Sequence, residues 1–262
     1  MSKFLDITKK AALAGGKVAE KYFDTGLKIQ RKRMGSWHDN FTKADIESEN
    51  EIKHLLSDAF PEHQVLGEET GLDTKSGDSN YIWHIDPLDG TNNFVGGNAT
   101  WGVSVGLAYR DVPIAGAIYF PTSNSIYLAE EGKGATKNGK KIRCKSVKRI
   151  EDSISVFSSY FKGPNTEKIL EALGKIGPKC LGVRMYGSAV YNFAMLAEGQ
   201  VSAIVKNRLM SWDICAGAVL VREAGGEVFT SKGKDWTIGE SGVFATATKE
   251  LKSEFMKLMN SK

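Results

Sequence analysis

Two aspartates lie three positions apart, Asp86 and Asp89, in the stretch HIDPLDGTNNF that follows the residues YIW. Carboxylates this close repel each other unless a cation lies between them. Gly90 and Thr91 come next, and their types suit a helix start, where unpaired N–H groups bind anions. Because Mg²⁺ prefers carboxylate oxygens and can bridge to phosphate, the stretch favours a site for Mg²⁺ and phosphate.

The neighbours of these aspartates indicate where they lie in the fold. The run YIWHI predicts a buried strand that ends at Asp86, turns at Pro87 and presents Asp89. Ligand sites commonly form at the carboxyl ends of sheet strands. A simpler interpretation is that these residues only form a turn, since Asp, Pro and Gly are the usual residues of turns. The dipeptides alone favour the turn.

Two amphipathic helices are predicted near the N-terminus, over residues 3–23 and 42–58. Their apolar residues recur at steps of three or four, and Thr42 is a candidate cap for the second helix. Short β-like runs follow, separated by turn residues, and KNGK at 137–140 predicts a tight turn. This first half therefore predicts helices packed on a mostly antiparallel sheet.

After about Arg149 the pattern changes to alternating strands and helices, from the run ISVFSSY to a final helix. The chain therefore predicts a layered α/β architecture in two packed halves, residues 1–149 and 150–262, which form one compact catalytic unit. With 262 residues, 41% of them hydrophobic, the chain is long enough to bury a sizeable core.

Composition limits the compartment and the partners. Cys144, Cys180 and Cys215 are widely spaced and support neither a disulfide framework nor a thiolate zinc site, so we expect a reducing, cytoplasmic compartment. The first 23 residues resemble neither a signal peptide nor a membrane span, and we expect no membrane partner. The net charge of +4 neither requires nucleic acid nor excludes a small anionic substrate.

The full string around the two aspartates, D-P-x-D-G-T-x-N-F, resembles the signature of the inositol monophosphatase family of Mg²⁺-dependent, lithium-sensitive phosphatases. Three further stretches are similar to family motifs: FTKAD at 41–45, GEE at 67–69 and SWDICAG at 211–217. The four stretches occur in the expected order over most of the chain. The resemblance implies a sugar-phosphatase-like fold, which is a layered α-β-α-β-α sandwich.

The resemblance also implies the metal ligands. One Mg²⁺ would be held by Glu68, Asp86 and the backbone carbonyl of Leu88, and a second by Asp86, Asp89 and Asp213. A third, weaker Mg²⁺ near Glu68 is typical of the family. Sharing the carboxylate of Asp86 fits the spacing of about 4 Å in two-metal sites. Taken singly, Asp213 would be a helix cap and Glu68 a solvated charge.

The resemblance further assigns catalytic roles to Asp45, Thr91 and Glu68. Asp45 and Thr91 would orient and help to deprotonate the attacking water, while Glu68 holds metal. Without its motif, Asp45 on a charged helix would be expected to face water. No covalent intermediate is required. The residues expected to contact phosphate or substrate, through side chains or backbone N–H groups, are Asp89, Gly90, Thr91, Gly187, Ser188, Ala189, Lys206 and Asp213.

Two departures from the family pattern concern the substrate. Inositol-specific relatives have a substrate-binding glutamate seven residues before the last metal aspartate, and this chain has Lys206 there. A cation suits a second phosphate or a carboxylate, so Lys206-Asn207-Arg208 indicates a different or more anionic substrate; alternatively, these side chains form a solvated surface loop. Val95-Gly96-Gly97-Asn98, where many relatives have a histidine and a Pro-Phe pair, also weakens a specificity for inositol.

Two classes of function follow. The first is an enzyme that hydrolyses a small phosphorylated metabolite, with inositol 1-phosphate as the leading substrate; the alternatives are fructose 1,6-bisphosphate, 3′-phosphoadenosine 5′-phosphate, NADP and histidinol phosphate. The second is a regulatory module that binds protein or RNA through basic clusters at 28–33 and 137–149. Such clusters more commonly form a solvated surface, and we expect no nucleic-acid partner. The intact carboxylates favour the enzyme. The resemblance also implies a homodimer.

Overall fold

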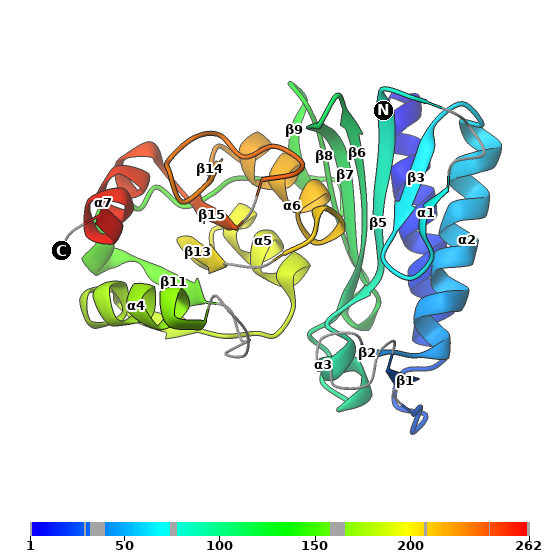
Figure 1. The fold of residues 1–262 in the computed structure, drawn as a ribbon, viewed down its shortest axis with the longest axis horizontal. Coiled ribbons are helices and arrows are strands. Elements are labelled where there is room, and N and C mark those ends of the chain that lie inside the picture. Colours follow the sequence, from blue (N-terminus) through cyan, green and yellow to red (C-terminus); the bar gives the residue numbers. More distant parts are fainter. Residues whose placement is uncertain are drawn as a thin grey trace.

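The protein is described by a computed structural model, which covers residues 2–28, 30–31, 40–73, 78–157, 166–206, 209–240 and 242–260. Within these residues the elements form five layers in the order helices, sheet, helices, sheet, helices (Figure 1). The predicted layered α-β-α-β-α sandwich is therefore confirmed. Parts of the basic cluster at 28–33, of the ISVFSSY run and of the Lys206-Asn207-Arg208 segment lie outside the described residues.

The first layer consists of helices α1 (Lys3–Glu20) and α2 (Lys43–Ala59), which cover the outer face of the larger sheet (Figure 1). The hydroxyl of Ser2 caps α1, and the hydroxyl of Thr42 caps α2 as predicted. Both helices match the predicted ones, although α1 ends earlier than expected. They approach each other closely, because a Cβ at Gly15 would lie only 2.5 Å from the Ile52 side chain.

The larger sheet has eight strands among the described residues, in the order β10-β9-β8-β7-β6-β5-β3-β4. Every neighbouring pair is antiparallel except β3 and β5, so the predicted mostly antiparallel sheet is confirmed. Asn138 and Gly139 have positive φ angles between β9 and β10 and form the predicted tight turn. The strands are β3 (Gln64–Gly67), β4 (Gly71–Asp73), β5 (Tyr81–Asp89), β6 (Gly102–Tyr109), β7 (Val112–Phe120), β8 (Ser125–Glu130), β9 (Gly134–Lys137) and β10 (Lys140–Ile142).

The smaller sheet has five described strands in the order β12-β11-β13-β15-β14. It is mixed: β11 is parallel to both of its neighbours, whereas β15 is antiparallel to both of its own. The predicted division at Arg149 falls between the two sheets, and the expectation that the two halves form one catalytic unit stays a prediction. The strands are β11 (Ile154–Phe157), β12 (Gly182–Arg184), β13 (Ala203–Lys206), β14 (Glu227–Phe229) and β15 (Val243–Thr246).

Two helices lie between the sheets, α5 (Ala189–Ala197) and α6 (Ser211–Glu223), and two cover the far face of the smaller sheet, α4 (Thr166–Ile176) and α7 (Lys249–Asn260) (Figure 1). No helix in the described ranges is both long and apolar enough to span a membrane. The short elements are β1 (Gln30–Arg31), β2 (Asn40–Phe41), α3 (Thr91–Val95) and the 3-10 turns Pro121–Ser123, Ile150–Asp152 and Gly177–Lys179.

Each boundary between layers has its own apolar core. Ile52 and Trp83 pack between the outer helices and the larger sheet, Phe193 and Ile214 pack between the two sheets, and Phe255 packs under the smaller sheet. The middle core is built from both sheets together with α5 and α6. Residues from the two halves therefore meet along a continuous buried interface, and the site lies where this interface reaches the end of β5.

Candidate metal and phosphate site

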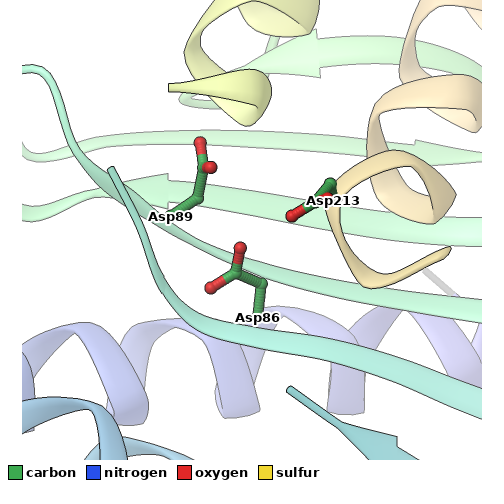
Figure 2. Close-up of side chains that lie close together, drawn as sticks. All are labelled: Asp86, Asp89 and Asp213. Atoms are coloured by element: carbon green, nitrogen blue, oxygen red, sulfur yellow. The ribbon is translucent and has the colours of Figure 1, made fainter. Parts of the chain in front are cut away.

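Three aspartates from different parts of the chain meet at one point. Oxygens of Asp86, Asp89 and Asp213 all lie within 4.8 Å of one another. Figure 2 shows that Asp86 and Asp89 come from β5, that Asp213 comes from the start of α6, and that the side chains point into a shared space. Among the described residues, this is the group of His, Cys, Asp and Glu side chains close enough to hold a metal ion.

An irregularity of β5 places the first two aspartates. Asp86 pairs with Ser104 of β6 and Asp89 with Gly102, so that β5 holds one residue more than β6 between the two pairs. Such a bulge fits Pro87, which has no N–H for the ladder. The predicted turn at Pro87 is therefore wrong: the strand continues to Asp89, because the bulge redirects the side chains without ending the pairing.

Two hydrogen bonds support this irregular segment. The backbone N–H of Leu88 donates to Asp86 Oδ1 at 2.9 Å, and the hydroxyl of Ser48 on α2 donates to the carbonyl of Pro87 at 3.2 Å. Asp86 itself is 1% exposed. Its carboxylate is thus oriented by its own strand and by the outer helix layer.

Helix α6 presents Asp213 in its first turn. Asp213 Oδ2 accepts a hydrogen bond from the backbone N–H of Met210 at 2.7 Å, so Asp213 supports the helix start and also faces Asp86. Two contacts connect this turn with the larger sheet. His84 Nδ1 lies 2.9 Å from Ser211 Oγ, and Ser104 Oγ donates to the carbonyl of Trp212 at 3.1 Å.

Glycines in the larger sheet let α6 approach this closely. A Cβ at Gly106 would lie 2.6 Å from Cys215 Sγ and 2.7 Å from the backbone N of Ala216. A Cβ at Gly116 would lie 2.7 Å from the Cα of Ala216. Side chains at these two positions would displace the helix, and with it Asp213.

Asp89 is held by the start of α5. The Ser188 hydroxyl and the backbone N–H of Val190, at 2.9 Å, donate to Asp89 Oδ2. Ser188 is also the cap of α5, so the residues Gly187-Ser188-Ala189 form a helix start. Asn93 fixes the adjoining loop, because its Nδ2 donates to the carbonyls of Thr100 and Tyr186. These bonds place Gly187, Ser188 and Ala189 beside the carboxylates.

The three carboxylates repel one another, and a bound cation would stabilise their charged forms. Burial, followed by the charges of Glu68, Asp89 and Asp213, raises the pKa of Asp86 well above its ordinary value. Burial, followed by the charge of Asp89, raises the pKa of Asp213 to about 7. Burial also raises the pKa of Asp89, and the hydrogen bond from Ser188 opposes this. An oxygen-rich, mutually repelling set of carboxylates is the donor set that Mg²⁺ prefers, so these residues fit this metal.

Glu68 lies near the cluster without being one of its three closest members. Its charge is the largest charge effect on the pKa of Asp86, and its backbone N–H donates to the carbonyl of Ile85 at 3.2 Å. Glu49 of α2 holds the turn that carries Glu68. The fully buried Glu49 carboxylate accepts hydrogen bonds from the backbone N–H groups of Glu69 at 2.8 Å and Thr70 at 2.9 Å.

Glu49 is not among the residues predicted from the sequence, although the sequence contains a signal for it. Glu49 lies three residues after Ile46 and three before Ile52, on the apolar side of α2. A carboxylate on that side is buried and therefore needs partners.

In addition to the roles that the resemblance implies, Asp45 has hydrogen bonds with Thr42, and Thr91 has one with Leu88. Asp45 Oδ2 accepts from the N–H and hydroxyl of Thr42, at 2.7 and 2.6 Å, and the Thr91 hydroxyl donates to the carbonyl of Leu88 at 3.3 Å. Gly90, with φ of 92°, precedes α3, so Thr91 begins this helix and does not cap it. The orientation of Thr91 by Asp45 stays a prediction.

The whole chain, residues 1–262, matches the model of the inositol monophosphatase family. The chain belongs to the inositol monophosphatase family. The resemblance inferred from the four sequence motifs is thereby confirmed, and the family is one of phosphatases that act on small phosphorylated substrates.

Similar members of the inositol monophosphatase family have different names. The fructose-1,6-bisphosphatase/inositol-1-monophosphatase of Aquifex aeolicus is 34% identical over 241 residues, which are 92% of this chain and 90% of that protein. The Nus factor SuhB of Vibrio cholerae is 30% identical over 254 residues, 97% of this chain and 94% of that protein. The crystal structure of extragenic suppressor protein suhB from Bartonella henselae has a TM-score of 0.92 at 27% identity and covers 99% of both chains.

Lys206, the departure from the inositol monophosphatase pattern, is not a surface residue. It ends β13, and only 3% of its surface is exposed. The alternative of a solvated surface loop is therefore wrong for Lys206; Asn207 and Arg208 lie outside the described residues. Burial lowers the pKa of Lys206, whereas the charges of Asp89 and Asp213 raise it. The structure thus brings Lys206 within electrostatic range of the metal-ligand candidates.

Proposed function

We propose that this chain is a Mg²⁺-dependent phosphomonoesterase. One observation carries the proposal: two halves of a phosphatase-family chain bring the carboxylates of Asp86, Asp89 and Asp213 to within 4.8 Å, where burial and mutual repulsion disfavour their charged forms. A cation relieves this repulsion, and a binding protein that does not use metal has no need for such a cluster.

The ligands of the metal would be Glu68, Asp86, the carbonyl of Leu88, Asp89 and Asp213. When bound, Mg²⁺ supplies a Lewis acid that activates water and offsets negative charge on the phosphate. The bulge in β5 supports this assignment, because it turns Asp86 and Asp89 into the space that Asp213 reaches from α6.

The remaining roles belong to the residues around α3. The backbone N–H groups of Gly90 and Thr91 would donate to phosphate oxygens. Asp45 and the Thr91 hydroxyl would orient the attacking water, which requires the Thr91 hydroxyl to exchange its bond to Leu88 for one to the water. The start of α5 at Ser188 would limit the space available to the rest of the substrate.

The substrate is a small phosphorylated metabolite, and inositol 1-phosphate is the leading candidate. The buried Lys206 favours a more anionic compound such as fructose 1,6-bisphosphate, which agrees with the double name of the Aquifex aeolicus relative. Phosphate release should therefore be measured on a panel of inositol 1-phosphate, fructose 1,6-bisphosphate, 3′-phosphoadenosine 5′-phosphate, NADP and histidinol phosphate, with and without Mg²⁺ and Li⁺.

We expect Mg²⁺-dependent release from at least one compound of this panel, inhibited by Li⁺. Asp89→Asn should abolish release while the protein stays folded, because one ligand charge is lost and the amide keeps the shape. Near-normal turnover of Asp89→Asn at saturating Mg²⁺ would contradict the proposal.

A second candidate function is a regulatory module that contacts protein or RNA. It is favoured by the name of the Vibrio cholerae relative, a Nus factor, and by the exposed basic residues of segment 140–149. No turnover on any compound, together with salt-sensitive RNA binding that is lost when Lys140 and Lys141 become Ala, would support this candidate. A homodimer and a cytoplasmic location stay predictions.

A further inference from the structure

His84 joins the strand that carries two of the metal-ligand candidates to the helix that carries the third. It lies on β5, two positions before Asp86, and only 2% of its surface is exposed. Its Nδ1 lies 2.9 Å from the hydroxyl oxygen of Ser211, the first residue of α6. Ser211 is 127 positions further along the chain, and Asp213 follows in the same helical turn. The contact therefore connects the two halves of the chain at the site.

Asp86 is flanked by two side chains of the larger sheet that contact α6. Side chains alternate between the two faces of a strand, so His84 and Asp86 point to the same face of β5. Ser104 of β6 pairs with Asp86, and its hydroxyl donates to the carbonyl of Trp212 at 3.1 Å. The strands that position Asp86 therefore also hold the first turn of α6, through Ser211 and Trp212.

The start of α6 depends on a metal-ligand candidate for its cap. Met210 precedes the helix and has no side-chain oxygen that could cap it. Its N–H donates instead to Asp213 Oδ2 at 2.7 Å. A bound cation would compete for this carboxylate, so the helix start needs support that is independent of Asp213. The contact between His84 and Ser211 provides such support.

The surroundings of His84 indicate that its ring does more than fill space. Its partner across the strands is Gly106, and a Cβ there would lie 2.6 Å from Cys215 Sγ of α6. An imidazole in this closely packed place is more costly to bury than an aliphatic side chain, unless a hydrogen bond compensates it. Ser211 supplies that bond, so a polar ring is needed here for its contact with α6.

We propose that His84 is a positioning residue, which acts through Ser211 to fix the separation of the carboxylates of Asp86 and Asp213. The inference rests on the proposed function, because it takes these carboxylates to be ligands of Mg²⁺ in the phosphatase reaction. An ion held by both aspartates requires their oxygens at a defined separation, and the hydrogen bond maintains it before the ion binds. Partners that orient metal ligands contribute about 10- to 100-fold to metal affinity.

Calorimetric titration of the metal-free protein with Mg²⁺ alone tests the proposal without an activity measurement. His84→Leu removes the hydrogen bond from one side, and Ser211→Ala removes it from the other. We expect each variant to bind Mg²⁺ about tenfold or more weakly than wild type. The double variant should bind no more weakly than the weaker single variant, because both substitutions remove the same bond. His84→Asn places an amide atom near the position of Nδ1 and should recover most of the affinity.

His63→Leu is the matched control. His63 is 5% exposed, and its ring is stacked between those of Phe60 and Tyr81, at centroid distances of 4.7 and 4.6 Å. Tyr81 begins β5, whereas the carboxylate cluster lies at the end of this strand. His63→Leu should therefore lose stability and keep the wild-type Mg²⁺ affinity, which separates general destabilisation from positioning.

The titrations decide the inference independently of the proposed function. Unchanged Mg²⁺ affinity of Ser211→Ala would overturn the inference, even if His84→Leu did not fold, and would leave the proposed function intact. Additive losses of affinity in the double variant would also overturn it, because the two residues would then act separately. Failure of the wild-type protein to bind Mg²⁺ at all would overturn both.

Discussion

The site takes its carboxylates from two regions that place them in different ways. Asp86 and Asp89 lie on one strand, and a bulge in that strand turns both into the same space. Asp213 arrives from a helix in the other half of the chain, and its position depends on how closely α6 packs on the larger sheet. Local backbone geometry therefore directs the first pair, of which the start of α5 also holds Asp89, whereas long-range packing places the third carboxylate.

This difference means that the Asp213 side of the site is more sensitive to substitutions elsewhere in the protein. The contacts of His84 with Ser211 and of Ser104 with Trp212 join residues that are more than 100 positions apart. Burial lowers the pKa of His84 to about 4, so its ring is neutral near pH 7 and forms a hydrogen bond with the Ser211 hydroxyl.

The largest effect is expected from Gly106→Val, which disrupts the packing of α6 on the larger sheet and thereby the position of Asp213. Its side chain would collide with Cys215 and Ala216 and push α6 away from the sheet. The free energy of unfolding should fall by about 3 kcal/mol, and Mg²⁺ affinity should fall with it. Urea unfolding and Mg²⁺ titration measure the two effects.

Gly174→Ala is the control for Gly106→Val. Gly174 lies within α4, and a Cβ there would meet nothing within 4 Å. This variant should gain up to about 1 kcal/mol of stability and keep its Mg²⁺ affinity. If Gly106→Val were as stable as wild type, close packing of α6 on the larger sheet would not depend on Gly106.

The next largest effect is expected at Glu49, which holds the turn after β3 that carries Glu68. Glu49→Gln replaces one carboxylate oxygen by an NH₂ group, so one of the N–H groups of Glu69 and Thr70 loses its acceptor. The free energy of unfolding should fall by about 2 kcal/mol, and the turn that carries Glu68 should loosen. Urea unfolding should show no comparable loss for Glu51→Gln, because Glu51 is exposed on the same helix; equal losses would contradict the role of Glu49.

The smallest of these effects is a pH dependence of the free energy of unfolding that distinguishes Asp213 from a carboxylate with an ordinary pKa. Its pKa is raised from 3.8 to about 7, so between these values the folded state binds a proton that the unfolded state has released. In EDTA, raising the pH from 4 to 7 should therefore lower the stability of wild type relative to Asp213→Asn, by at least about 1 kcal/mol. Urea unfolding across this range checks the slope, and parallel profiles for the two proteins would refute it.

Much of the fold and part of the site could be predicted from sequence, for physical reasons that differ by element. The amphipathic period of α1 and α2 and the cap at Thr42 are local signals, and they predicted the observed helices. The bulge at Pro87 depends on pairing between β5 and β6, which a strand pattern does not contain. For the same reason the turn predicted at Pro87 was wrong.

Burial of charged residues was the least predictable feature. Lys206 is buried because β13 is a central strand covered by helices, so the open surface-loop alternative did not hold. The support of the Glu68 turn by Glu49 joins α2 to β3 across the fold. Such contacts depend on tertiary structure, and only the spacing of Glu49 among apolar residues hinted at one of them.

The most direct test of the central claim is equilibrium titration of Mg²⁺ into wild-type protein, Asp86→Asn and the exposed control Asp58→Asn. Asp86 is the most buried of the three clustered aspartates and the predicted shared ligand. We expect wild type and Asp58→Asn to bind Mg²⁺ alike and Asp86→Asn to bind at least about 100-fold more weakly, since even supporting residues of metal sites contribute 10- to 100-fold. Unchanged Mg²⁺ binding by Asp86→Asn would contradict the claim that the two halves of the chain meet to form a metal site.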